Sequence, residues 1–285
     1  MRPRPCRAAI LACLRLASIR MTPTPASCAP LDLTELRQAL AGQRVRILYQ
    51  PIIRLSDRCP ISIEVLARLA DPVRGVLEPG AFVPGMEDAG LGRALFEAVI
   101  ETAFSDWHDA GIGALGMSLA INLPHDVLID PTLRNWLEAA RIRHAIPAGR
   151  IVIELTESQP LLRMPELGLA VTALRAWGYG LAIDDVGPDI RDHAPLLDLP
   201  FTSLKLDRAL VQAIGSGESL AFMRTVMASA RLAGLTVVAE GVEDERTWHA
   251  VAAHGVDHVQ GYLVSRPLAA AALVAWHDGR CAGPY

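Results

Sequence analysis

Two adjacent carboxylates, Asp184 and Asp185, follow the short apolar run 179–183. Such a run is typical of a buried strand, so both acids should lie at its carboxyl end. Neighbouring carboxylates without a base are costly in a buried place, and a divalent cation, solvent or a helix N-terminus relieves that cost. A helix N-cap is the common role of a single aspartate after a strand. The cation is favoured here because the pattern recurs along the chain.

Other apolar runs also stop at a polar or ionisable side chain. Those ends supply Glu64, Asn122, Glu154, Lys205, Glu240 and Gln260. Oxygen ligands without thiolate or imidazole suit Mg²⁺ or Mn²⁺ better than Zn²⁺. So many carboxylates predict two cations per site, about 3.5–4 Å apart and sharing one aspartate, a pair that activates water against a phosphodiester.

Lys205 can orient that water or stabilise the developing charge. Asp207 lies two residues further on, hence on the same face of the strand, and can hold the lysine. The alternative for these two residues is a plain surface ion pair.

Alternating strands and helices must position these residues. The apolar, β-branched runs cover 45–53, 61–67, 116–122, 150–155, 179–184, 201–206, 235–240 and 257–263. Helical patterns cover 31–41, 91–110, 130–142, 163–177, 207–232, 244–254 and 267–277. This alternation predicts an α/β fold with a parallel sheet covered by helices. Eight units in about 250 residues match a (β/α)8 barrel. A doubly wound open sheet is the alternative, but no GxGxxG follows the first strand.

Composition sets further limits on the 285-residue chain. A net charge of -4 without a basic block argues against duplex nucleic acid as a partner. Five scattered cysteines without a CxxC pair indicate a reducing, cytoplasmic location. No apolar run is long enough to span a membrane. We expect residues 1–30 to be a disordered extension or a start assigned too early, and residues 31–285 to form a single barrel domain.

Seven short motifs occur in a fixed order. They are Tyr49-Gln50-Pro51, Glu64-Val65-Leu66-Ala67-Arg68, Ile153-Glu154-Leu155-Thr156-Glu157-Ser158, Ile183-Asp184-Asp185, Leu204-Lys205-Leu206-Asp207-Arg208, Val238-Ala239-Glu240-Gly241-Val242-Glu243 and Gln260-Gly261-Tyr262. Together they resemble the EAL domain family, bacterial cyclic di-GMP phosphodiesterases built on a modified (β/α)8 TIM-type barrel. The resemblance runs from about Arg44 to Trp276.

This resemblance implies a role for each matching residue. The first cation would be held by Glu64, Asn122, Glu154 and Asp184, and the second by Asp184, Asp185 and Glu240. Lys205 would assist the attacking water, with Glu64 and Glu240 as further catalytic residues. The substrate side would comprise Gln50, Pro51, Arg68, Glu87, Asp207 and Gln260. The implied reaction opens one phosphodiester of cyclic di-GMP to give linear pGpG, with Mg²⁺ or Mn²⁺ as cofactor.

The sequence departs from the family pattern in three places. Val65 replaces an alanine, and Leu69 replaces a common tryptophan. The stretch 186–193 reads Val-Gly-Pro-Asp-Ile-Arg-Asp-His instead of Phe-Gly-Thr-Gly-Tyr-Ser-Ser-Leu. The resemblance makes Glu157 the anchor of that loop and makes the loop part of a possible homodimer interface. A non-catalytic cyclic di-GMP receptor or interaction module on the same barrel is therefore an alternative to the enzyme. A third is a Mg²⁺-dependent barrel enzyme of enolate type with Lys205 as base, which would bind no nucleotide. The sequence does not identify a regulatory partner.

Overall fold

The structure is a computed structural model that describes residues 31–156, 163–187, 194–215 and 217–281. Its strands are β1 (Val45–Arg54), β2 (Pro60–Asp71), β3 (Gly75–Leu77), β4 (Ser118–Leu123), β5 (Ile151–Thr156), β6 (Gly180–Val186), β7 (Ser203–Leu206), β8 (Thr236–Ala239) and β9 (His258–Val259). Each of the eight predicted apolar runs overlaps one of these strands. The predictions for residues 1–30 and for the loop at 188–193 lie outside the described residues.

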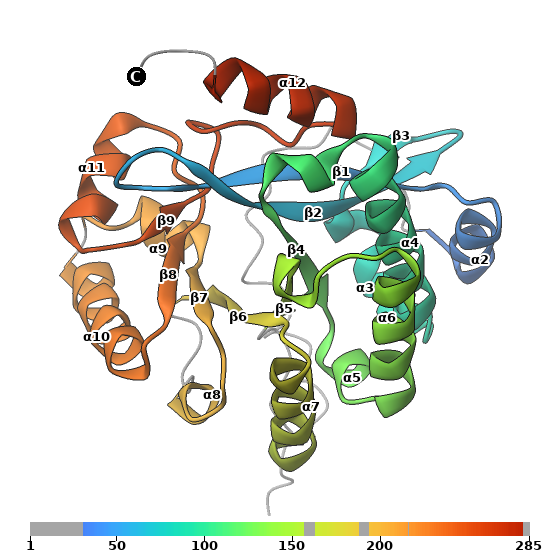
Figure 1. Cartoon of the computed structure of the whole chain (residues 1–285), viewed down its shortest axis with the longest axis horizontal. Helices are drawn as coiled ribbons and strands as arrows, with labels where there is room; N and C mark the ends of the chain where they lie inside the picture. Colours follow the sequence, from blue (N-terminus) through green and yellow to red (C-terminus); the bar gives the residue numbers. More distant parts are fainter. Residues whose placement is uncertain (1–30, 157–162, 188–193, 216, 282–285) are drawn as a thin grey trace, which may run out of the picture. The chain divides into compact units, whose positions relative to one another are not determined.

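Eight strands close into a barrel (Figure 1). Neighbours follow the order β1, β9, β8, β7, β6, β5, β4, β2, and β1 also pairs with β2, while the short β3 extends the sheet beyond β2. All pairings from β2 through β4 to β9 are parallel, but β1 is antiparallel to both of its neighbours. The expectation of an all-parallel sheet is therefore wrong for this strand. Residues 55–59 form a connection too short for a crossover helix, so β1 and β2 form a hairpin.

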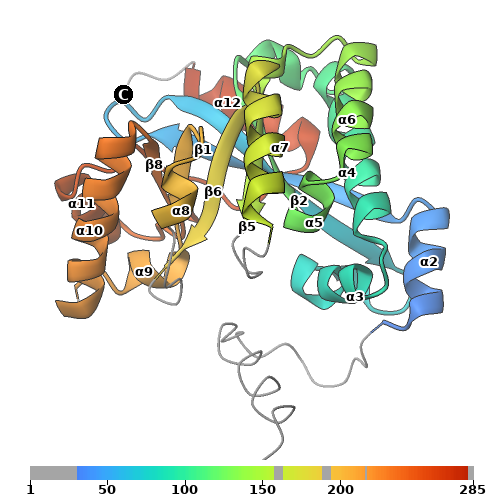
Figure 2. The same cartoon turned by 90° about the horizontal axis from the view of Figure 1, so that it is seen from below.

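Helices cover the barrel on the outside (Figure 2). They are α2 (Leu33–Ala41), α3 (Val83–Asp88), α4 (Gly92–Asp109), α5 (His125–Leu128), α6 (Pro131–Arg143), α7 (Met164–Ala176), α8 (Ala194–Leu197), α9 (Arg208–Gln212), α10 (Gly217–Ala233), α11 (Glu245–Ala253) and α12 (Ala270–Cys281), with short 3₁₀ turns at Pro79–Ala81, Ile112–Leu115 and Ala148–Arg150. The single helix predicted over 207–232 is in fact two, because the chain turns after Ala213. No helix in the described part of the chain combines the length and apolar character that crossing a membrane requires.

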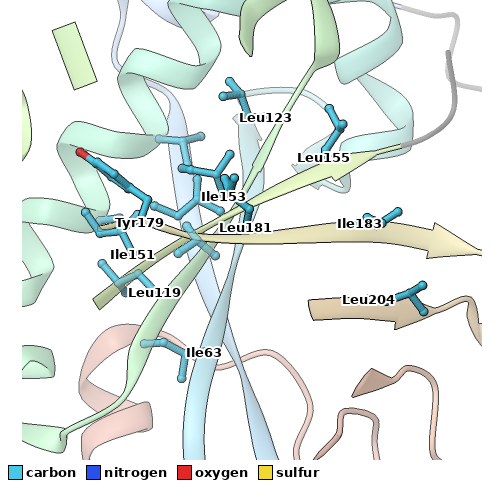
Figure 3. Packing of buried hydrophobic residues seen from close by; sticks show 14 of the residues in the cluster. Ile63, Leu119, Leu123, Ile151, Ile153, Leu155, Tyr179, Leu181, Ile183 and Leu204 are labelled. Carbon is cyan, nitrogen blue, oxygen red and sulfur yellow. The ribbon is translucent and has the colours of Figure 1, made fainter. Parts of the chain in front are cut away.

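Alternation along the strands separates the core from the barrel interior. In β5, Ile153 and Leu155 are buried on one side while Glu154 points to the other. Neighbouring strands repeat this pattern, and Figure 3 shows several of the apolar side chains that pack together. Burying each such side chain stabilises the fold by about 1.5–3 kcal/mol. This packing lets the same strands hold polar groups at the interior positions.

Candidate active site

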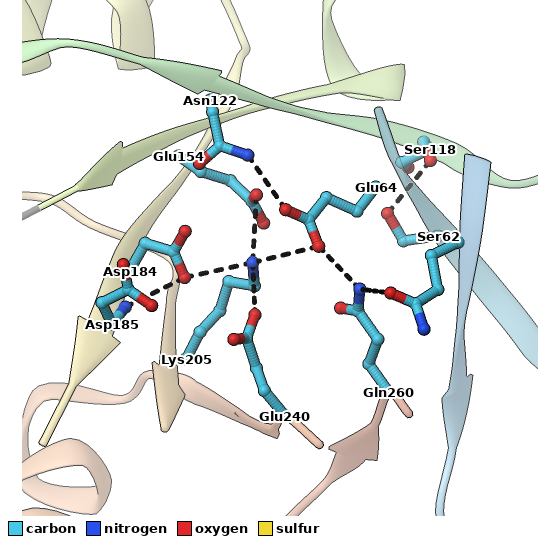
Figure 4. A network of polar contacts seen from close by, with 11 residues as sticks. Ser62, Glu64, Ser118, Asn122, Glu154, Asp184, Asp185, Lys205, Glu240 and Gln260 are labelled. Carbon is cyan, nitrogen blue, oxygen red and sulfur yellow. Dashed lines mark hydrogen bonds and ion pairs between the residues drawn. The ribbon is translucent and has the colours of Figure 1, made fainter. Parts of the chain in front are cut away.

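A single buried lysine lies among four carboxylates inside the barrel (Figure 4). The Nζ atom of Lys205 is 2.6 Å from Glu240, 3.1 Å from both Glu154 and Asp184, and 3.6 Å from Glu64. The lysine side chain is only 1% exposed. The surface ion pair considered for this lysine is therefore wrong, and four strands or strand ends bring carboxylates to one ammonium group on β7.

Glu64 is held by two amides as well as by the lysine. The Nδ2 of Asn122 donates to Glu64 at 2.9 Å, and the Nε2 of Gln260 donates to it at 2.6 Å. Gln260 also donates to the side-chain oxygen of Gln50 at 3.0 Å, and Gln50 donates to the carbonyl of Ser265 at 3.1 Å. Because that carbonyl can only accept, this chain of bonds fixes the orientation of both glutamine amides. Glu64 therefore has a defined orientation before any ligand binds.

The side-chain oxygen of Asn122 is not used in its hydrogen bond to Glu64 and could bind a metal ion. Its nitrogen is used by Glu64, which leaves its amide oxygen, the atom that a hard cation would bind. The strand register explains how Asn122 reaches the site, because it lies directly opposite Glu154 in the β4–β5 pair. Glu64 instead lies in the middle of β2 rather than at its end, since β2 continues as far as Asp71.

Burial governs the electrostatics of the four inner acids. It raises the pKa values of Glu154 and Glu240 well above the ordinary range and also raises that of Asp184, with the neighbouring carboxylates adding to the shift. Burial acts the same way on Glu64, but Lys205 and the two amides outweigh it and hold the pKa of Glu64 below its usual value. Burial opposes the charge of Lys205 too, yet the four carboxylates raise its pKa well above normal. The lysine is therefore an ammonium ion at neutral pH.

Asp185 occupies the outer end of the cluster. Its backbone is in the left-handed region at φ 58°, which is uncommon for a residue other than glycine. Its amide donates to the side chain of Asp184 at 3.0 Å. Part of its side chain is exposed to solvent. The protein around the carboxyl group still removes enough water to raise its pKa, and the negative charge of Asp184 adds to this shift, which brings the pKa to about 7.

The acids form two groups suited to cations. Oxygen atoms of Glu64, Glu154 and Asp184 lie within 4.8 Å of one another, and so do those of Asp184, Asp185 and Glu240. Asp184 belongs to both groups, as an aspartate shared by two ions would. If all five carboxylates were ionised, they and the one ammonium would carry four excess negative charges, which two divalent cations would neutralise. The donor set thus fits two Mg²⁺ or Mn²⁺ ions.

The remaining predicted residues lie further out. Pro51 follows Gln50 in β1 and is buried. Arg68 lies on the same face of β2 as Glu64, about 13 Å further along the strand, and donates to the carbonyl of Ala67 at 2.8 Å. Glu87 lies exposed on α3. Glu157, the predicted loop anchor, is outside the described residues.

The expectation that Asp207 holds the lysine is wrong. Its carboxylate accepts hydrogen bonds from the amides of Ala209 at 2.7 Å and Leu210 at 3.3 Å, so it caps α9. Within the described residues, the charged partners of Lys205 are the four inner acids. A helix beginning directly after a strand requires a cap, and that requirement decides where Asp207 points.

Two contacts near the site were not predicted. One is the link from Gln50 to Gln260, which joins positions far apart in the chain. The other is the packing of Arg208 over Gly241, with an ion pair of 2.7 Å from Arg208 to Glu243. The glycine has φ 66°, and its position one residue after Glu240 was the available signal for a close approach. The first contact joins β1 to the end of β9, and the second ties the ends of β7 and β8 to each other.

Comparisons with known proteins agree on one family. The family model described as "EAL domain" matches residues 33–267. The bifunctional diguanylate cyclase/cyclic di-GMP phosphodiesterase MucR of Pseudomonas aeruginosa is 30% identical over 250 residues, 85% of this chain and 36% of MucR. The cyclic di-GMP phosphodiesterase PA2567 of the same organism is 31% identical over 249 residues, 86% of this chain and 42% of that protein. The chain thus spans about two fifths or less of the length of these two relatives.

Two solved structures are similar to this chain in fold. The PaMucR phosphodiesterase in complex with c-di-GMP superposes with a TM-score of 0.78 at 30% identity, covering 85% of this chain and 98% of that one. The FimX EAL domain from Pseudomonas aeruginosa bound to c-di-GMP has a TM-score of 0.72 at 23% identity, covering 82% and 94%. The second likeness concerns the fold alone.

Proposed function

We propose that this chain, which belongs to the EAL domain family, hydrolyses cyclic di-GMP to linear pGpG in a reaction that depends on divalent cations. The observation that carries the proposal is the pair of carboxylate groups that share Asp184 around a buried ammonium. A barrel kept only as a scaffold would gain nothing from so many buried acids, because their mutual repulsion lowers its stability.

The residues divide into two metal-binding sets. Glu64, Asn122, Glu154 and Asp184 would hold one Mg²⁺ or Mn²⁺ ion, and Asp184, Asp185 and Glu240 a second. When bound, such ions supply activated water and neutralise charge on a phosphodiester oxygen. Gln260 and Gln50 support this set indirectly by fixing Glu64.

Lys205 acts as a hydrogen-bond donor rather than a base. The surrounding carboxylates raise its pKa in the metal-free chain, and its ammonium can orient the attacking water or stabilise negative charge. The enolate-type enzyme would instead use the lysine as its base. Glu240 lies nearest to the ammonium at 2.6 Å, and we assign its carboxylate as the acceptor for a proton of that water.

The outer residues would bind the nucleotide. Arg68 would pair with a substrate phosphate, for which a guanidinium is well shaped. Gln50, Pro51 and Glu87 would line the same side of the pocket, as the family resemblance implies. Asp207 would act through its cap on α9, which keeps the end of β7 in place.

A catalytically weak or inactive receptor is the second candidate. The sequence observation that favours it is the stretch 186–193, where Pro188 and two aspartates replace the hydroxyl residues typical of the family. Proline removes a backbone donor, and the aspartates add negative charge to the stretch of sequence that follows Asp185. A receptor would bind cyclic di-GMP without cleaving it.

One incubation separates these candidates. Cyclic di-GMP is mixed with the full chain and Mg²⁺ or Mn²⁺, and the nucleotides are separated by chromatography, with Lys205→Met as the control. Appearance of pGpG only with the unchanged chain supports the enzyme. Retention of intact cyclic di-GMP on the protein supports the receptor, and absence of both binding and product refutes the proposal.

A further inference from the structure

The register between β1 and β2 arranges three kinds of side chain along one face of this strand pair (Figure 1). The opposite residues are Gln50 with Glu64, Leu48 with Leu66, and Arg46 with Arg68. Residues directly opposite each other in an antiparallel pair share a face, and so do residues two apart along a strand. The first pair belongs to the candidate active site, so the leucines and then the arginines continue its face outward. We call these six residues the β1–β2 face.

The two arginines are neighbours of like charge. The Nη1 group of Arg46 donates to the carbonyls of Gln43 at 2.6 Å and Val45 at 2.9 Å, and Arg68 donates to that of Ala67 at 2.8 Å. Neither arginine has an ion pair with a residue in the described part of the chain. Like charges directly opposite each other weaken a strand pair. Each guanidinium also has further N–H groups, which are available to a ligand.

The acid that follows Arg68 most closely is engaged elsewhere. Asp71 is buried and accepts hydrogen bonds from the amides of Val73 at 3.0 Å and Arg74 at 2.8 Å. Its carboxylate also forms ion pairs with Arg44 at 3.8 Å and Arg74 at 3.6 Å. The arginines at this end of β2 are thus of two kinds, those that share Asp71 and those on the β1–β2 face.

The spacing along the β1–β2 face follows the order of groups in a nucleotide. Successive residues on one face are about 7 Å apart, so the leucine pair lies about 7 Å and the arginine pair about 13 Å beyond Glu64. With a phosphate at the cations beside Glu64, a nucleotide continues outward through its ribose to its base. Leu48 and Leu66 are both half-buried and offer an apolar surface to a ring at that distance. The far edge of the base then reaches the arginine pair.

We propose that Arg46 recognises the outer edge of a guanine base and makes the site specific for guanine over adenine. This role rests on the proposed function, which places the phosphate at the cations. Guanine presents two acceptors on that edge, O6 and N7, and one guanidinium binds both at once. Adenine presents N7 and an amino group, so it offers a second donor where Arg46 needs an acceptor. Because Arg68 is assigned to a phosphate, Arg46 is the guanidinium that is free to bind the base.

Titration calorimetry with three cyclic dinucleotides and Mn²⁺ tests this role. The bases are guanine, adenine and hypoxanthine, which keeps O6 and N7 but lacks the exocyclic amino group of guanine. Four forms of the full chain are compared: residue 46 unchanged, Arg46→Met, Arg46→Lys, and Arg37→Met as the control. Arg37 is exposed on α2, so its replacement removes the same charge from another surface. Each form also carries Lys205→Met, so that the nucleotide stays intact.

The effect should depend on the base. We expect Arg46→Met to weaken binding of the guanine and hypoxanthine dinucleotides by on the order of 10–100-fold, the scale of one bidentate contact. The weaker binding of the adenine dinucleotide should not change, and Arg37→Met should have no effect on any of the three. Arg46→Lys should recover little of the loss, because an ammonium lacks the planar fork of a guanidinium.

Two further measurements separate recognition from a structural role. In chains that keep Lys205, the same losses should appear as a higher KM while kcat stays constant, because Arg46 lies far from the cations. Without ligand, Arg46→Met should unfold at the same temperature as the unchanged chain or slightly above it, because its repulsion with Arg68 is gone. A marked loss of stability would make the bonds to Gln43 and Val45 the purpose of Arg46 and would overturn the proposal.

The proposal is also overturned if Arg46→Met binds cyclic di-GMP as tightly as the chain with Arg46 does. A third contradiction would be an equal loss for all three bases that Arg46→Lys restores, which would show attraction by charge alone. These results would leave the proposed function intact. If neither calorimetry nor kinetics detects cyclic di-GMP with residue 46 unchanged, the proposed function fails and the role of Arg46 fails with it.

Discussion

Replacing Lys205 by methionine tests the electrostatic account of the barrel interior. Methionine keeps the apolar stem of the side chain and removes only the ammonium. In the metal-free protein this leaves Glu64, Glu154, Asp184 and Glu240 without their shared cation. We therefore expect the variant to be folded but clearly less stable when chelator is present.

The magnitude follows from the burial of the lysine. Its side chain is 1% exposed and its partners lie within 3.6 Å, so the loss is that of one member of a buried charge network. Such losses cost about 3–5 kcal/mol. Each kcal/mol shifts the melting temperature of a domain of this size by roughly 2–4 °C, so the expected drop is roughly 6–20 °C. Protonated acids repel one another less, so the decrease in melting temperature should be larger at pH 8 than at pH 5.

Thermal unfolding with EDTA and with Mn²⁺ provides the assay. Divalent cations would neutralise the same carboxylates, so Mn²⁺ should stabilise Lys205→Met more than it stabilises the unchanged chain. Glu138→Gln is a suitable control, because it weakens an ion pair with Arg141 on α6, away from this cluster. An equal loss of stability with EDTA and Mn²⁺, or a loss near zero with EDTA, would refute the reasoning.

Three further predictions follow from the same contacts. The pKa of Asp185 is about 7 in the folded state and about 3.9 in an unfolded chain, so the folded state binds more protons between these values. The stability of the metal-free protein should therefore fall as the pH rises from about 4 to 7. Midpoints of urea unfolding at several pH values would show this fall, and Asp185→Asn should make the midpoint depend less on pH. Gly241→Ala should lower the free energy of unfolding by about 1–2 kcal/mol in a urea titration, because residue 241 has a positive φ and the new methyl group would meet the side chain of Arg208. Adding Arg208→Ala removes that clash but not the backbone strain, so the double variant should recover only part of the loss. Gln50→Leu should weaken Mn²⁺ binding by roughly 10–100-fold in calorimetry, since it releases Gln260 from its fixed orientation, and unchanged affinity would contradict the role of that link.

Local sequence was enough to locate the eight barrel strands and most of the polar residues near their ends. Runs of apolar residues that stop at an acid placed Glu154 and Asp184 on neighbouring strands, and the structure brings both to the same lysine. Side chains alternate between the two faces of any strand, so the sequence of one strand predicts which residues share a face without knowledge of its neighbours. Their assigned roles in metal binding and catalysis are proposals that measurement has to decide.

Contacts between distant segments could not be predicted in this way. The hydrogen bonds from Gln260 to Gln50 and Glu64 depend on how the barrel closes, with β1 antiparallel between β2 and β9. The position of Glu64 within β2 depends on a hairpin that extends that strand to Asp71. Asp207 was assigned to the lysine from spacing alone, whereas the need to cap α9 determines its contacts. Strand pairing and helix capping thus determine these contacts, and the periodicity of the sequence does not predict them.

Hydrolysis of cyclic di-GMP in water enriched in ¹⁸O tests the central proposal most directly. The full chain is incubated with cyclic di-GMP and Mn²⁺ in the labelled water, and the products are identified by mass spectrometry. The proposal predicts pGpG that carries a single ¹⁸O atom in its terminal phosphate, and no product when EDTA replaces Mn²⁺. Intact cyclic di-GMP after prolonged incubation, unlabelled pGpG, or equal cleavage with EDTA would contradict it.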